Sequence, residues 1–278
     1  MDSLLVGAAL TSAVLHAAWN ASVKSSTQPA QAMTAQMLGS AAMALPILLW
    51  AGLPAPAAWP WMAASTLLNM GAIASLLRGY RHGGFGVVYP MARASSVLLV
   101  LPLAAAIAGE WPGHWGIAGV ALVSAAVMML ALGRGKVRSM TRPALVWTLA
   151  AGAFTAGYIV CDGQGVRQAR SPLAYGCSLA IVNGLLWTGL QQRAGMRLAT
   201  LATQWPRVLP VAFAAMLSYL LILWVWTLAP IALASALRDT SAVFATVIAI
   251  TVLKEPFDRS TLFAVALATA GSMLIRLG

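Results

Sequence analysis

Two arginines stand inside long apolar stretches and are the residues best suited to chemistry. Arg93 lies in VVYPMARASS and Arg238 in ALRDTS, and each is followed three positions later by a serine, Ser96 or Ser241. An arginine at the centre of a membrane span costs at least about 2.5–3.5 kcal/mol by insertion scales, so such residues face a watery cavity or a polar partner. The pattern predicts either binding of a solute carboxylate or a structural contact with backbone carbonyls or an acidic residue.

Other polar residues share helical faces with these arginines or with each other. Tyr89 lies four positions before Arg93, and His16 and Asn20 are four apart. Residues three or four apart lie on one helix face. Tyr89 and Ser96 therefore extend the Arg93 stripe, and His16 with Asn20 forms a second one. These side chains suit a pocket with a few hydrogen-bonding groups. An equal alternative is that His16 and Asn20 form hydrogen bonds with a neighbouring helix.

An acidic residue and three prolines complete the candidate set. Asp239 directly follows Arg238 and is a candidate proton carrier. Prolines remove a backbone donor and kink helices. Pro90, Pro102 and Pro230 are therefore candidate gating points, or static kinks that improve packing.

The elements that must position these residues follow from composition. Of 278 residues, 60% are hydrophobic and only 8% charged, against about a quarter charged in soluble domains. The composition therefore predicts a polytopic membrane protein. Its net charge of +11 comes mostly from residues between apolar runs, which predicts membrane orientation signals and no nucleic-acid partner. The sequence shows no metal-ligand spacing.

A membrane-spanning helix needs about 20 mostly apolar residues. We therefore predict ten spans, at approximately 3–23, 32–51, 60–80, 86–108, 114–133, 143–162, 172–190, 207–228, 231–253 and 260–277. The gaps between them are short and leave no room for a soluble domain.

An internal repeat organises these spans. At an offset of 145 positions, Arg93 matches Arg238, Ser96 matches Ser241, and Glu110 matches Glu255. Charged matches are informative because the chain has only 17 Lys and Arg and six Asp and Glu. A fainter match earlier in the chain places His16 on Phe154 and Asn20 on Tyr158, which adds Phe154 and Tyr158 to the candidate pocket as an aromatic wall.

A duplicated five-helix unit enters the membrane upside down relative to the first, as in many secondary transporters. We predict an all-α integral membrane protein with ten transmembrane helices in two inverted five-helix repeats, residues 1–133 and 143–278, joined by a basic linker at 134–142. Small residues in the fifth and tenth spans, Gly119 and Gly271 among them, predict close packing of these two helices at the pseudo-axis.

The chain resembles the drug/metabolite transporter superfamily, and most of all its EamA-type branch. The resemblance rests on HAAWNASVK, YPMARASS, AGEWPGHWGIAG and LKEPFDRSTLFAVALATAGSMLI within ten spans. It implies a transporter without a cofactor that exports amino acids, including aromatic ones, or other small metabolites, by alternating access.

These observations favour a secondary transporter that works as a monomer in a cell membrane, the inner membrane if the source is bacterial. The alternative is a proton-coupled exporter of drugs or other small organic solutes. A channel would need polar rings along a pore, and an enzyme would need catalytic groups at membrane depth, for which the sequence shows no motif. The side of the termini stays open, because the distribution of Lys and Arg places them outside, whereas the resemblance implies the cytoplasm.

Overall fold

The computed structural model describes residues 1–24, 26, 28–83, 85–132, 140–244 and 259–277. This part of the chain is helical and holds no strand. Its α-helices are α1 (Ser3–Lys24), α2 (Pro29–Ala51), α3 (Trp59–His82), α4 (Phe85–Ala108), α5 (His114–Leu132), α6 (Arg142–Gln168), α7 (Pro172–Arg193), α8 (Trp205–Leu228), α9 (Ile231–Asp239) and α11 (Arg259–Leu277), with short 3-10 helices η1 (Pro56–Ala58) and η3 (Leu198–Gln204).

Seven of the described helices are long and apolar enough to cross a membrane, and two shorter apolar helices, His114–Leu130 and Leu262–Leu277, accompany them. The predicted all-α membrane fold is therefore confirmed. Local sequence sets several helix starts. Thr141 and Ser171 cap α6 and α7 by accepting hydrogen bonds from the backbone N–H groups of Ala144 and Ala174, and a proline follows within the first turn of each helix, where its missing N–H costs nothing.

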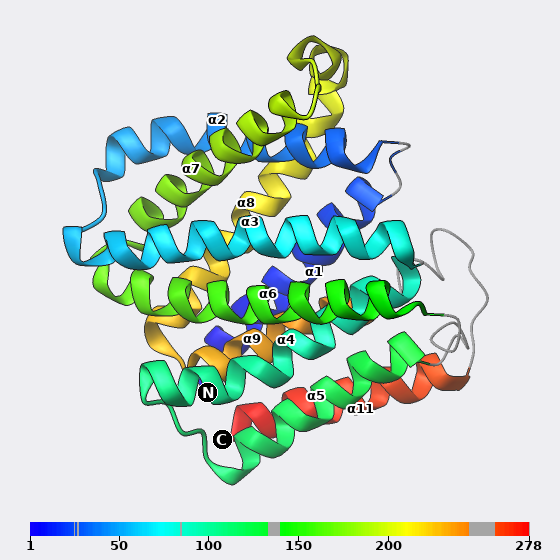
Figure 1. The fold of residues 1–278 in the computed structure, drawn as a ribbon. Coiled ribbons are helices and arrows are strands. Elements are labelled where there is room, and N and C mark those ends of the chain that lie inside the picture. Colours follow the sequence, from blue (N-terminus) through cyan, green and yellow to red (C-terminus); the bar gives the residue numbers. More distant parts are fainter. Residues whose placement is uncertain (25, 27, 84, 133–139, 245–258, 278) are drawn as a thin grey trace.

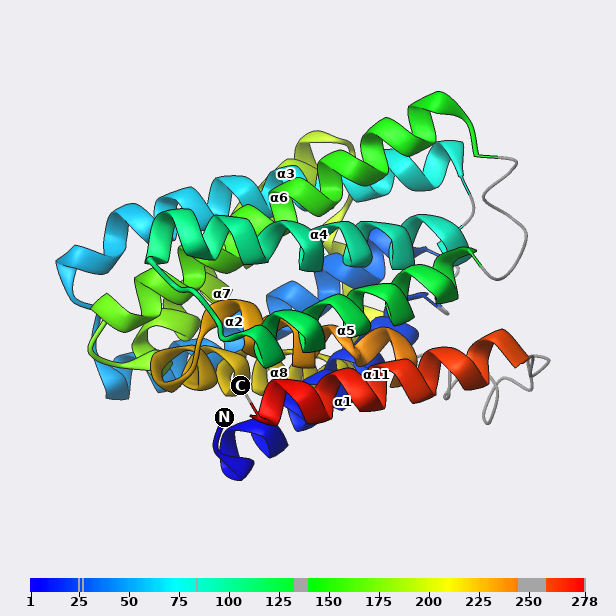
Figure 2. The same ribbon diagram turned by 90° about the horizontal axis from the view of Figure 1, so that it is seen from below.

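The helix–helix contacts are equivalent in the two halves of the chain. Helix α3 packs along α6, and α8 packs along α1; α4 also packs on α6, and α9 on α1. Helices α2 and α7 pair with each other, as do α5 and α11 (Figures 1 and 2). Exchanging each helix with the one five spans later reproduces these contacts, as expected for two five-helix repeats related by a pseudo-two-fold axis.

The predicted packing of the fifth and tenth spans is present. A Cβ atom on Gly119 would lie 2.7 Å from the carbonyl oxygen of Gly271, and one on Gly271 would lie 2.8 Å from the carbonyl oxygen of Gly119. The two backbones touch at this point, which only glycine permits. This seam between α5 and α11 holds the ends of the two repeats together.

The ninth span differs from the prediction of one helix over 231–253. Helix α9 ends at Asp239, Thr240 adopts a turn, and residues 241–244 are again helical. The Thr240 hydroxyl donates to the carbonyl oxygen of Leu237 at 2.6 Å, and such local bonds compete with helix continuation. Residues 245–258, which include Glu255, lie outside the described part of the chain.

Candidate substrate-binding cavity

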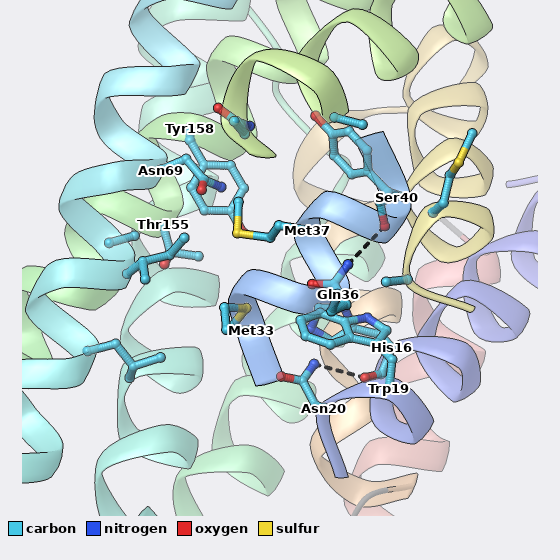
Figure 3. Close-up of a pocket in the computed structure, with 18 of the residues that line it drawn as sticks. His16, Trp19, Asn20, Met33, Gln36, Met37, Ser40, Asn69, Thr155 and Tyr158 are labelled. Atoms are coloured by element: carbon cyan, nitrogen blue, oxygen red, sulfur yellow. Dashed lines mark hydrogen bonds between the residues drawn. The ribbon is translucent and has the colours of Figure 1, made fainter. Parts of the chain in front are cut away.

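A cavity of about 230 Å³ opens between the two repeats. Helices α1, α2, α3 and α4 of the first repeat and α6, α7, α8 and α9 of the second contribute to its wall. Figure 3 shows Asn69, Thr155 and Tyr158 on one side of it, with His16, Trp19 and Asn20 on the other. The cavity therefore lies where an inverted-repeat transporter places its solute.

Six of the nine binding residues proposed from the sequence line this cavity, although they are far apart in the chain. They are His16, Asn20, Tyr89, Arg93, Tyr158 and Arg238. The structure thus gathers them from α1, α4, α6 and α9. Their role in binding stays a prediction.

Ser96 and Ser241 do not line the cavity. Helix α4 approaches α6 so closely at Gly152 that a Cβ atom there would lie 3.4 Å from the backbone nitrogen of Ser96. Ser96 is fully buried in this contact, and its hydroxyl donates to the carbonyl oxygen of Arg93 at 2.8 Å. Ser241 is also buried. Helical spacing alone did not show which part of the stripe a neighbouring helix covers.

Phe154 lies outside the cavity as well. Its side chain is 38% exposed, and its ring covers Gly71 of α3. The next residue, Thr155, lines the cavity instead, together with Ala151 one turn earlier. One residue turns a helix by about 100°, so the residue given by the faint repeat match lies one position away from the one that lines this cavity. The polar residues Thr155 and Tyr158, which are three positions apart, were the available signal.

The two repeat-related arginines have different partners. The Arg93 guanidinium forms an ion pair with the Asp239 carboxylate of the opposite repeat, and both side chains are buried. This is the structural alternative foreseen for Arg93, and it also occupies Asp239, the residue proposed as a proton carrier. Neither end of this pair is left with an uncompensated charge.

Arg238 has no such counter-charge. It is 6% exposed and lines the cavity, and within the described part of the chain no carboxylate forms an ion pair with it. Its Nη2 lies 3.2 Å from Nδ1 of His16. Because guanidinium groups only donate, Nδ1 accepts this hydrogen bond and the proton of a neutral imidazole sits on Nε2. The His16 ring packs edge-on against Trp19, with the ring centroids 5.0 Å apart.

The repeat explains this asymmetry. Under the offset of 145, Asp239 corresponds to Ala94. The two-fold counterpart of the Arg93–Asp239 pair would therefore join Arg238 to residue 94, where the first repeat has only a methyl group. Arg238 consequently lines the cavity with a positive charge that no carboxylate of the described residues pairs with.

Several cavity residues were not predicted. They are Trp19, Met33, Gln36, Met37, Ser40, Asn69, Thr155, Asn183, Met216 and Tyr219. Gln36 donates to Ser40 at 3.0 Å, and Ser40 donates to the carbonyl oxygen of Ala212. Amides within apolar spans were the signal for Gln36, Asn69 and Asn183. The remainder of the wall is apolar or thioether in character.

The proposed gating prolines have different settings. Pro230 directly precedes α9. The backbone N–H of the next residue, Ile231, donates to the Glu110 carboxylate at 2.6 Å, and Glu110 forms an ion pair with Arg167. Pro102 lies in α4 and is exposed. Pro90 lies in α4 too, with its side chain outside the described part. Gating by these prolines stays a prediction.

Comparison with known proteins gives the fold and a family. A solved structure described only as the crystal structure of a protein superimposes with a TM-score of 0.78, covering 99% of this chain and 96% of that one at 15% identity. A search of curated proteins found no match. Residues 142–277 match the EamA-like transporter family. This EamA-like half supplies α6 to α11, including Tyr158 and Arg238.

The apolar helices indicate a multi-pass membrane protein, and the match of residues 142–277 to the EamA-like transporter family suggests a transporter of small solutes. The family comprises transporters rather than enzymes.

Proposed function

We propose that this protein is a secondary transporter that exports amino acids, aromatic ones first, and that Arg238 binds the solute carboxylate. The observation that carries the proposal is the buried guanidinium of Arg238, which lines the cavity without an ion-pair partner in the described residues. A buried charge of this kind is costly unless it is paired. A bound carboxylate supplies the missing partner through a charge-assisted hydrogen bond.

The remainder of the cavity supports a small solute with an apolar body. Its volume of about 230 Å³ is below the roughly 300–1,000 Å³ of drug-sized pockets. Trp19, Tyr89 and Tyr158 provide aromatic surface, and Met33 and Met37 provide adaptable apolar surface. An amino acid with an aromatic side chain fits both features. A larger drug or other organic solute is the alternative, and the volume favours the smaller molecule.

The inverted repeats supply a mechanism. In such architectures each half adopts the conformation of the other, so that a central site opens first to one side and then to the other. The Arg93–Asp239 ion pair and the α5–α11 seam join the two repeats. We infer that they keep the halves in register while the cavity changes its access.

The proposal is tested by counterflow in liposomes that contain the purified protein. Labelled L-phenylalanine is expected to accumulate when unlabelled L-phenylalanine or L-tryptophan is trapped inside, and L-phenylalaninamide, which lacks the carboxylate, is expected to drive little exchange. Arg238→Ala should abolish counterflow. Arg193→Ala, which removes an exposed arginine at the end of α7, is the matched control and should not change it.

Equal exchange of the acid and the amide, or normal counterflow in Arg238→Ala, would refute carboxylate recognition by Arg238. Absence of exchange for every amino acid tested, with exchange of larger drugs, would support the alternative solute class.

A further inference from the structure

A second buried acidic residue lies behind the cavity wall and has no part in the binding site described above. Asp162 of α6 is 2% exposed and does not line the cavity. Its two carboxylate oxygens accept hydrogen bonds from two phenols, from Tyr219 of α8 at 2.6 Å and from Tyr175 of α7 at 3.2 Å. One carboxylate thus ties three helices of the second repeat together.

Within the described part of the chain, Asp162 is surrounded by hydroxyl groups and a thiol, and no cation forms an ion pair with it. Ser65 faces it from α3 and Cys161 is its neighbour on α6, and Arg238 of α9, at the cavity, acts on its charge. None of the described lysines, arginines or histidines forms an ion pair with it. Asp239, by contrast, is paired with Arg93.

This difference in partners separates the two acidic residues by function. A buried carboxylate held by an arginine keeps its charge, because protonation would leave the arginine unpaired. A buried carboxylate held only by neutral hydroxyls can exist in either protonation state. On gaining a proton, one oxygen of Asp162 forms an O–H bond, and the phenol that donated to that oxygen becomes the acceptor.

Tyr219 connects this carboxylate to the cavity. Its hydroxyl donates to Asp162, whereas its side chain lines the cavity that holds Arg238. Tyr175 packs directly over Gly165, where a Cβ atom would collide with the phenol. Glycine at position 165 therefore leaves space for the phenol of Tyr175, the second hydrogen-bond donor to Asp162.

We propose that Asp162 is a proton-binding site that communicates with the solute cavity through Tyr219. Asp162 forms no ion pair with Arg238 among the described residues, but the two charges act on each other, so protonation of Asp162 should strengthen the attraction of Arg238 for an anionic group. This coupling rests on the proposed function of Arg238, whereas proton binding by Asp162 does not. A metal cation fits less well, because the two phenols present donors rather than lone pairs to the carboxylate.

Infrared difference spectroscopy on the full-length protein in liposomes tests the proposal without any solute. Lowering the pH is expected to produce the carbonyl-stretch band of a buried, protonated carboxyl group in the wild type. Asp162→Asn should lose this band. Asp2→Asn, which removes an exposed carboxylate, should keep it, as should the double variant Arg93→Met/Asp239→Leu. Tyr219→Phe should keep the band but shift its frequency, because one hydrogen bond to the carboxyl group is gone.

Four results would overturn the proposal: no titrating carboxyl band in the wild type, a band that persists in Asp162→Asn, a band that disappears in Arg93→Met/Asp239→Leu, or a band that responds to sodium at constant pH. Because the Tyr219→Phe frequency shift is measured in a protein that retains Asp162, it decides the assignment even if Asp162→Asn fails to fold. Failure of the phenylalanine counterflow would refute the proposed function and leave this result standing.

Discussion

Arg93 and Arg238 occupy the same position in the two repeats but have opposite surroundings. Arg93 forms an ion pair with Asp239, whereas Arg238 forms a hydrogen bond with His16 and no ion pair among the described residues. The cause is a single unmatched position, Asp239 in one repeat and Ala94 in the other. We propose that this difference at one neighbouring position leaves Arg93 for structure and Arg238 for the solute.

The largest expected effect comes from removing the counter-charge of Arg93. Asp239→Asn leaves a buried guanidinium unpaired, and we expect a loss of about 3–5 kcal/mol in the free energy of unfolding. Thermal or denaturant unfolding in detergent micelles measures it. The double variant Arg93→Met/Asp239→Leu removes both charges and should unfold near the wild-type midpoint. An Asp239→Asn variant as stable as the wild type would show that the ion pair does not stabilise the fold.

The next effect comes from making the two repeats alike. Ala94→Asp introduces a carboxylate at the position that corresponds to Asp239 in the other repeat. This carboxylate should compete with the carboxylate of the solute for Arg238. We expect solute affinity to fall by roughly 30-fold or more, corresponding to about 2 kcal/mol or more for a buried charge pair. Equilibrium binding of labelled L-phenylalanine measures the change. Ala94→Asn, of the same size but without charge, is the control, and an equal loss in both variants would point to steric disruption.

The smallest effect concerns the seam that both repeats share equally. Gly119→Ala inserts a methyl group between the touching backbones of α5 and α11, for which we expect a loss of about 1–3 kcal/mol in unfolding free energy. Gly7→Ala in α1 is the matched control, because nothing lies within 4 Å of the added methyl group. If the two variants unfold alike, the seam is not a close contact in the membrane.

The fold could be predicted from the sequence because hydrocarbon leaves the backbone few choices. Each span must satisfy its own hydrogen bonds, so apolar runs separated by Pro, Gly and charges gave helix bounds within about three residues of those of α1 to α8, except that α6 continues to Gln168, past the predicted end at 162. The break after Asp239 was missed because it depends on the Thr240 hydroxyl and on packing. The seam between α5 and α11 was predicted because small residues in the last span of each repeat allow two helices to pack closely.

The site was predicted only in part, because helical spacing defines a face but not what covers it. Arg93, Arg238, His16 and Tyr158 were found from charge, spacing and repeat position. The ion pair across repeats was not assigned, since Asp239 was considered only beside its neighbour Arg238. Asp162 was not among the predicted residues, because its two phenolic partners on α7 and α8 follow only from the packing of the second half.

The central claim is that Arg238 holds the solute and Arg93 holds the structure. Equilibrium binding of L-phenylalanine to Arg238→Ala and to Arg93→Met/Asp239→Leu tests it most directly. We predict that Arg238→Ala loses binding by roughly 30-fold or more, while the double variant binds within a few-fold of the wild type. Binding that survives in Arg238→Ala and is lost in the double variant would contradict the account.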